Sequence, residues 1–429
     1  MAEVLISPGV LARENDQSQI TAGPIQAGAA LIGPTVKGQE DIPTLVTSYS
    51  EYQAAFGSTF LSGSNQYTFL TSISAYNYFQ NGGSTLLVTR VTPGAFSQAT
   101  SSLINTGSAG STVAANVSPF ALATLAEGNI MNSEGPLGSN GTLASGSSDN
   151  FRWEITSPNT SSGVFSLLLR QGNDTQTSKA VVETYSNLSL DPLAPNYISK
   201  VIGDQVQTVR GTGTDVYLQS SGSYPNASRF IRVSAVNAQT PNYFDNAGTP
   251  KDIFTGSIPE AQSGSFEGAI GDITGSVSPA SFYQAIKNSN SQGLVGTDYT
   301  TAINLLGNRD EFRYNIITAP GLILANGTSG AGWTSIQSNC ENRGDAIFVG
   351  DLVNYDSTLT QVTSGAASVD SSYVATYWPW LQVIDPDSRE LVWVPASTLI
   401  PGVYAYNDRA GEPWFAPAGI NRGGLGVVN

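Results

Sequence analysis

Three stretches of the sequence bring together residue types that could carry out chemistry. Asp385, Asp387 and Glu390 place three carboxylates close together, a pattern that could bind calcium. The stretch lacks the central glycine and the length of an EF-hand loop, and the apolar runs 381–384 and 391–394 flank it. The pattern therefore favours a hairpin turn over a metal site.

The second stretch, residues 326–332, is rich in glycine and precedes a predicted helix at 333–343, a geometry that can cradle phosphate. It has no lysine after the glycines and does not fit the spacing of a dinucleotide-binding loop, so we predict a flexible loop. The third candidate is Cys340, which lies in the predicted helix with Arg343 nearby. Because no histidine is available to activate it, we expect a buried structural thiol.

The composition also argues against catalysis. The 429-residue chain contains no histidine, which removes the commonest general base and the commonest metal ligand. Its formal net charge of −15 and pI of about 4.3 argue against binding to nucleic acid or to an anionic membrane surface. No apolar run approaches the roughly 18 residues of a membrane span. We therefore predict a protein that is not an enzyme, has no cofactor or metal, binds no nucleic acid and does not insert directly into a membrane.

Helix and strand patterns alternate in two separate parts of the chain. The first part predicts strands at 29–33, 43–47 and 85–89, a helix at 49–56 capped by Ser48 or Ser50, and a longer helix at 67–80. The second part predicts helices at 281–288, 297–307 and 333–343, and strands at 314–318 and 346–349. This alternation predicts an α/β core domain with a mixed, largely parallel sheet and flanking helices. The C-terminal tryptophans are expected mainly in the core of a compact cap on that sheet: Trp378, Trp380, Trp393 and Trp414.

Between these two parts the composition changes sharply. Residues 97–150 contain no Lys or Arg and are dense in Ser, Thr, Gly and Asn, and strand patterns recur between 151 and 236. We predict a mostly β inserted domain at 97–245 and a discontinuous α/β core formed by 23–96 and 246–429.

The N-terminal residues 1–22 are predicted to form an extended arm. Its apolar strand-forming residues surround a Pro-Gly turn, and they are Val4, Leu5, Ile6, Ser7, Pro8, Gly9, Val10 and Leu11. Such an arm either folds back on its own domain or adds a strand to the sheet of a neighbouring molecule.

A series of short motifs runs through the chain in a fixed order. Towards the N-terminus they are residues 7–10 with 13–14, 32–34 with 37–38, and 79–83 with 88–91. A more specific set follows at 372–373, 377–380, 385–386, 394–395, 401–405, 407–409, 414 and 416–423, and its central residues are Tyr373, Trp380, Asp385, Pro386, Pro395, Gly402, Asp408, Arg409, Trp414, Pro417, Gly419 and Asn421. In order and spacing, over nearly the whole chain, they resemble the tail sheath proteins of contractile-tailed bacteriophages and the related sheaths of contractile injection systems.

The resemblance implies a structural subunit of a virion tail. Such subunits assemble in the host cytoplasm as stacked hexameric rings around a tail tube, and contraction of the sheath drives the tube through the host cell envelope. The implied partners are other copies of the chain, linked by β-strand exchange, together with the tail tube, baseplate and tail terminator proteins. The inserted domain would face outward. The resemblance leaves open whether the particle is a phage or a tailocin-like device.

One departure from the family pattern concerns the C-terminus. Sheath subunits continue beyond the motif at 416–419 into a C-terminal domain that faces the tube, whereas this sequence ends at Asn429. We therefore expect that domain to be missing, in a fragment or in a shortened natural subunit. The alternative function is a glycan-binding or adhesive protein of the virion surface, because the inserted region is rich in Ser, Thr and Asn and the chain is rich in Tyr and Trp.

Overall fold

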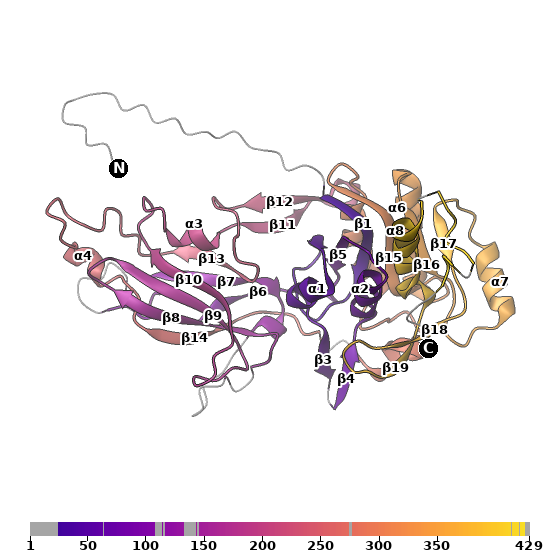
Figure 1. Ribbon diagram of the computed structural model, residues 1–429, viewed down its shortest axis with the longest axis horizontal. Helices are drawn as coiled ribbons and strands as arrows, with labels where there is room; N and C mark the ends of the chain where they lie inside the picture. Colours follow the sequence, from indigo (N-terminus) through magenta and orange to yellow (C-terminus); the bar gives the residue numbers. More distant parts are fainter. Residues whose placement is uncertain are drawn as a thin grey trace, which may run out of the picture.

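A computed structural model describes residues 25–62, 64–107, 114, 116–132, 143, 146–273, 277–412, 414–419 and 421–424 (Figure 1). The predicted arm, with its residues 4–11, lies outside the described residues. Figure 1 shows two large sheets next to each other, and most of the helices gather around the one that contains β1, while α3 and α4 lie beside the other.

The first sheet has six strands in the order β17-β16-β15-β1-β5-β2. Its parallel strands are β1 (Ile25–Gly33), β5 (Leu86–Arg90), β15 (Phe312–Ile323), β16 (Ile347–Asp351) and β17 (Val374–Thr376). The edge strand β2 (Thr44–Val46) runs antiparallel to β5. Strands that are covered on both faces read as apolar runs, and all five residues of β5 are buried. The expected mixed α/β architecture is confirmed.

Helices cover both faces of this sheet because successive side chains of a strand point to opposite sides. Ala30 and Ile32 of β1 belong to the apolar cluster with α5 (Thr300–Leu306) and α6 (Gly327–Arg343). Ala29 and Leu31 belong to the cluster on the other face, and the helices that pack there are α1 (Tyr49–Phe56), α2 (Leu70–Gln80) and α8 (Ile400–Ala410). Helix α1 starts where predicted, since the Ser48 side chain accepts a hydrogen bond from the backbone N–H of Glu51.

The second sheet has seven strands in the order β10-β9-β8-β14-β6-β7-β13, and all its pairings are antiparallel. The strands are β6 (Gln98–Ser101), β7 (Phe120–Glu127), β8 (Phe151–Asn159), β9 (Val164–Gln171), β10 (Val181–Ser189), β13 (Ile231–Val236) and β14 (Gln262–Glu267). Strand β14 lies between β8 and β6, although the predicted insertion ends at 245. Because β14 pairs with both strands, the segment that builds this sheet continues to residue 267, beyond the predicted end of the insertion. The division of the chain into domains stays a prediction.

Smaller elements connect and cover the sheets. The hairpins are β3 (Thr59–Ser62) with β4 (Asn65–Thr68), β11 (Val206–Arg210) with β12 (Tyr217–Ser221), and β18 (Leu381–Ile384) with β19 (Leu391–Val394). The remaining α-helices of the described residues are α3 (Ile198–Ile202), α4 (Asp252–Thr255) and α7 (Leu359–Ala367). In the part of the chain that the structure describes, no helix combines the length and hydropathy that a membrane crossing requires.

Three local predictions are wrong, two of them for helices and one for a loop. Residues 67–68 pair in β4, where Tyr67 packs against Phe282, so the helix begins only at Leu70. Residues 281–288 form short 3-10 turns, since Phe282 and Ile286 enter different apolar clusters and Tyr283 has a positive φ of 48°.

The glycine-rich stretch that was predicted to be a loop forms the first turns of α6. Its glycines allow close packing: a Cβ at Gly330 would lie 2.4 Å from the Leu324 carbonyl oxygen, and one at Gly332 2.9 Å from the Gly296 carbonyl oxygen.

Candidate functional site

Of the three carboxylates at residues 385–390, that of Asp385 caps the β18–β19 turn. Asp385 is 2% exposed, and its Oδ1 accepts hydrogen bonds from the backbone N–H groups of Asp387 (2.9 Å) and Ser388 (3.4 Å). The Asp387 carboxylate instead accepts a hydrogen bond from the Tyr49 hydroxyl at the start of α1. The hairpin prediction is confirmed, and the described residues contain no group of three or more His, Cys, Asp or Glu side chains that could hold a metal ion.

The structure separates the predicted motif residues into a buried set and a surface set. Trp380 donates a hydrogen bond from Nε1 to the Val353 carbonyl oxygen (3.1 Å), and Gly402 lets α8 approach α2 closely. The buried set is Trp380, Asp385, Pro395 and Gly402, while Tyr373, Pro386 and Pro417 are half-buried. The surface set is Asp408, Arg409, Trp414, Gly419 and Asn421. The motif residues therefore divide between the core and the surface.

Exposed aromatic side chains are concentrated near the C-terminus of the described chain. Tyr377, Trp378, Trp414 and Phe415 are 40%, 45%, 77% and 38% exposed. The expectation that the tryptophans are mainly core residues is confirmed for Trp380, which is 5% exposed, and it is wrong for the exposed Trp378 and Trp414. Trp393 is half-buried and packs against the same apolar cluster as Trp380. Large exposed apolar side chains in a group are typical of surfaces that bind other proteins.

The first sheet also has two open edges. Strands β17 and β2 end the strand order, so each has one side without a partner strand within the described chain. An open edge presents backbone N–H and C=O groups that can pair with a strand of another molecule.

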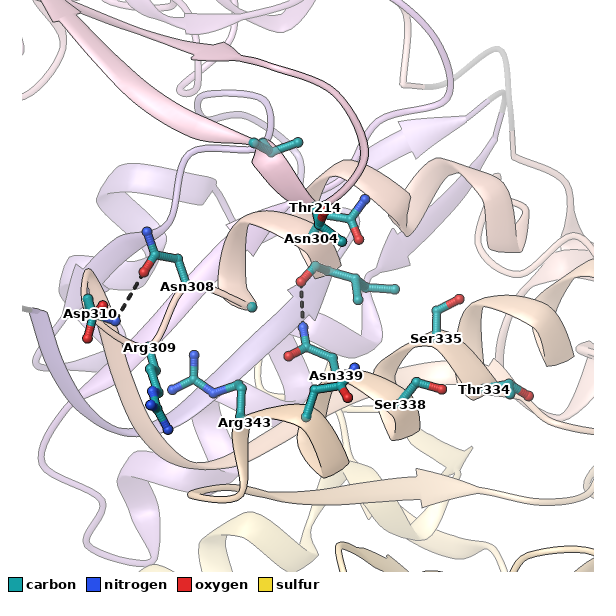
Figure 2. Close-up of a pocket in the computed structure, with 14 residues that line it drawn as sticks. Thr214, Asn304, Asn308, Arg309, Asp310, Thr334, Ser335, Ser338, Asn339 and Arg343 are labelled. Carbon is teal, nitrogen blue, oxygen red and sulfur yellow. Dashed lines mark hydrogen bonds between the residues drawn. The ribbon is translucent and has the colours of Figure 1, made fainter.

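The surface beside α6 contains a polar groove of about 670 Å³ (Figure 2). It lies between the tip of the β11–β12 hairpin, the loop that joins α5 to β15, and one face of α6. Its side chains are mostly amides and hydroxyls, among them Asn304, Asn308, Ser335, Ser338 and Asn342. Figure 2 shows Asn339 reaching from α6 towards α5, where its Nδ2 donates a hydrogen bond to the Ile303 carbonyl oxygen (2.6 Å).

Charged groups are concentrated where the two large sheets meet. The buried Arg90 guanidinium donates from Nη1 to the carbonyl oxygens of Gly38 (2.6 Å) and Glu127 (2.9 Å). The Glu127 carboxylate accepts a hydrogen bond from the backbone N–H of Glu40 (2.8 Å). Burial raises the pKa values of Glu127 and Asp41 to about 7, and burial lowers that of Arg90 to about 10.

Lys37 is a second buried cation at this junction. Its ammonium lies 3.5 Å from Asp149 and 5.1 Å from the centre of the Phe151 ring, and burial lowers its pKa. These contacts join a loop of the first sheet to residues near β8.

Cys340 is fully buried in α6, as the sequence predicts, and burial raises the pKa of its thiol to about 12. Such a thiol is protonated at neutral pH and is a poor nucleophile.

The sequence prediction missed the polar groove and the charged junction. The α6 face is visible in the sequence as hydroxyl and amide residues at 334, 335, 338, 339 and 342, which is the spacing of one helix face. The junction has no such signal, because Glu40, Arg90 and Glu127 are distant in the sequence and meet only through the fold.

Comparison with known proteins gives a limited set of similarities. No family model matches the chain. Over 136 residues the chain is 26% identical to the tail sheath protein of Vibrio phage KVP40, and the match covers 32% of this chain and 18% of that relative. The chain therefore matches less than a fifth of the length of this curated relative.

Two solved structures show weak similarity. A sheath tail protein from Listeria innocua is 9% identical with a TM-score of 0.44. The superposition covers 90% of this chain and 57% of that one. A sheath tail protein from Desulfitobacterium hafniense is 12% identical with a TM-score of 0.39. The superposition covers 93% of this chain and 62% of that one.

Proposed function

We propose that the chain is a structural subunit of a contractile tail sheath. The observation that carries this proposal is the 26% identity over 136 residues to the tail sheath protein of Vibrio phage KVP40. The order and spacing of the C-terminal motifs between Tyr373 and Asn421 agree with it. In this proposal the subunits form stacked hexameric rings around a tail tube, and contraction of the sheath drives the tube through the host cell envelope.

The proposed partners follow from that role. They are other copies of the chain, the tail tube protein, and the baseplate and tail terminator proteins, in a virion tail assembled in the host cytoplasm. Two kinds of surface are suitable for contacts between copies: the open edges at β17 and β2, and the exposed aromatic side chains of Trp378 and Trp414. We also propose a role for each part of the chain. The arm 1–22 links subunits, residues 23–96 and 246–429 form the core domain, and residues 97–245 form an inserted domain that faces outward.

The arm provides the test. In the proposal, the apolar residues 4–11 add a strand to the sheet of a neighbouring subunit, so a charge at Ile6 would have to be desolvated in that contact. We expect the concentrated parent protein to form long tubular polymers in negative-stain electron micrographs, and the Ile6→Asp variant to form none while its circular dichroism stays unchanged.

The matched control is Asn15→Asp, which adds the same charge outside the apolar residues and should leave the polymers intact. Normal tubes from Ile6→Asp would contradict the strand exchange. A parent chain that remains monomeric at every concentration would contradict the sheath role for this chain.

A further inference from the structure

The β11–β12 hairpin forms a two-stranded sheet of its own, apart from the two large sheets. Its register runs from Val206 opposite Ser221 to Arg210 opposite Tyr217. A two-stranded hairpin is at best marginally stable in water, so its stability depends on what it packs against. The two ends of this hairpin contact different parts of the molecule.

The base of the hairpin is attached to the seven-stranded sheet. Asp204 Oδ1 accepts hydrogen bonds from the backbone N–H groups of Ser223 (2.8 Å) and Tyr224 (2.7 Å). The Asn226 side chain accepts from the backbone N–H of Gln205 (3.0 Å) and donates to its carbonyl oxygen (2.7 Å). Helix α3, directly before this base, packs in the apolar cluster of the seven-stranded sheet. The base is therefore expected to move with that sheet.

The tip of the hairpin packs on the six-stranded sheet's side, against α5 and α6. Val216 is 8% exposed and belongs to their apolar cluster, and Val209 and Leu218 are half-buried against it. Figure 2 shows Thr214 at the tip next to Asn304 of α5. Among the described residues, no hydrogen bond or ion pair joins the hairpin to α5 or α6. The contact is small and apolar, and the polar groove lies beside it.

The chain itself connects the two large sheets at the charged junction. It passes from the first sheet to the second between β5 and β6, and it returns between β14 and β15. Arg90, the last residue of β5, donates there to the carbonyl oxygen of Glu127, the last residue of β7 (2.9 Å). The seven-stranded sheet is thus held at the junction and again at the hairpin tip.

These two attachments lie at opposite ends of β1. Ile25, its first residue, is opposite Phe312, which follows the groove rim at 308–310. Gly33, its last residue, is opposite Arg90 at the junction. At about 3.3 Å per residue, the nine residues of β1 separate the two attachments by roughly 25 Å. A body held at two points this far apart keeps its orientation, whereas a body held at one point can pivot.

We propose that the β11–β12 hairpin is a releasable strap between the two parts of the molecule. While its tip packs on α5 and α6, the seven-stranded sheet keeps one orientation, and when the tip leaves, that sheet pivots at the junction. Each large sheet has its own apolar cluster, so both stay folded and the release is a local opening. The proposal concerns motion within one chain, and it holds or fails independently of the sheath function.

Single-molecule energy transfer in the full chain tests the pivot. Dyes on Thr184→Cys in β10 and Thr363→Cys in α7 report the distance between the two parts, since both positions are exposed. The native Cys340 is buried and does not compete for the dyes. We expect one narrow distribution of transfer efficiency in the parent. Val216→Asp places a charge in the apolar contact and should make the distribution about twofold wider.

The matched control is Tyr217→Asp, which adds the same charge at the neighbouring residue. Tyr217 is 48% exposed and outside the apolar cluster, so this variant should give the distribution of the parent. Val216→Ala removes only part of the contact and should give an intermediate width, and it carries the test if Val216→Asp does not fold. An unchanged distribution in the folded Val216 variants would overturn the proposal.

Hydrogen exchange distinguishes release of the strap from unfolding. In Val216→Asp, the backbone amides of β11 and β12 should exchange about tenfold faster than in the parent, while those of β8, β9, β1 and β15 keep their rates. Faster exchange in β8 and β9 as well would mean that the seven-stranded sheet unfolds together with the hairpin, and it would overturn the pivot.

Discussion

Charged residues are concentrated where the two sheets meet, and the raised pKa values of two carboxyl groups there predict that this junction is sensitive to pH. Asp41 and Glu127 both have pKa values raised to about 7, first by burial and then by the charge of Glu40. The nearby cations are Arg90 and Lys37, and neither forms an ion pair with these two carboxylates among the described contacts.

The sign of the pH effect follows from these shifts. A carboxyl group whose pKa is higher in the folded than in the unfolded protein binds more protons when folded, so its contribution to stability is present at acidic pH and is lost as the pH rises through about 7. We predict that the melting temperature falls between about pH 5 and about pH 8, and that Glu127→Gln makes this fall shallower. Thermal unfolding followed by circular dichroism checks this.

The exposed Glu267 provides the control, since Glu267→Gln should leave the slope unchanged. A parent protein whose stability is constant over this pH range would contradict the assignment of raised pKa values to the junction.

At the scale of elements, close packing of helices decides which glycines are required. Gly402 lies in α8, where a Cβ would approach the Asn77 carbonyl oxygen of α2 to 3.0 Å and the Asn81 side chain to 3.1 Å. Gly365 lies in α7, and its nearest neighbours would be 3.7 Å from a Cβ, which is ordinary contact.

This difference predicts opposite effects of one substitution. Alanine is favoured over glycine inside a helix by about 1 kcal/mol, so Gly365→Ala should raise the free energy of unfolding by about that amount. Gly402→Ala should lower it by about 1–3 kcal/mol, because α8 must move away from α2. Urea unfolding of both variants measures the difference. A gain in stability for Gly402→Ala would show that the α2–α8 contact is looser than described.

At the scale of the whole molecule, the second sheet has its own apolar cluster and its own buried ionic network. Arg170 donates to Asp174 through Nε (2.8 Å) and Nη2 (2.9 Å) and to Glu154 through Nη1 (2.8 Å), and Arg152 also pairs with Asp174. These groups are almost fully buried, and removal of one charge from such a network typically costs about 3–5 kcal/mol.

We therefore predict that Asp174→Asn destabilises the seven-stranded sheet more than the six-stranded sheet. Hydrogen exchange with mass spectrometry should show faster exchange in β8, β9 and β10, and little change in β1, β15 and β16. The exposed Asp252 supplies a control, because Asp252→Asn removes a carboxylate outside the network. Equal acceleration in both sheets would indicate one cooperative unit instead.

The sequence by itself determined the elements whose signals are local. The Ser48 cap with Gly57 defines α1, the apolar run 86–88 of β5 marks a strand covered on both faces, and the apolar runs 381–384 and 391–394 define the β18–β19 hairpin. Each of these signals lies within a few residues, so neighbouring side chains are sufficient to set the backbone conformation.

Only the tertiary structure decided the features that depend on distant contacts. The glycines at 330 and 332 belong to a helix because neighbouring backbone packs against them, and β14 joins the second sheet through partners more than a hundred residues away in β8 and β6. The polar groove and the charged junction arise in the same way, from side chains of separate elements. Residue type and spacing determine what one segment can form, whereas packing determines which segments meet, and the surfaces that could serve assembly depend on that second step.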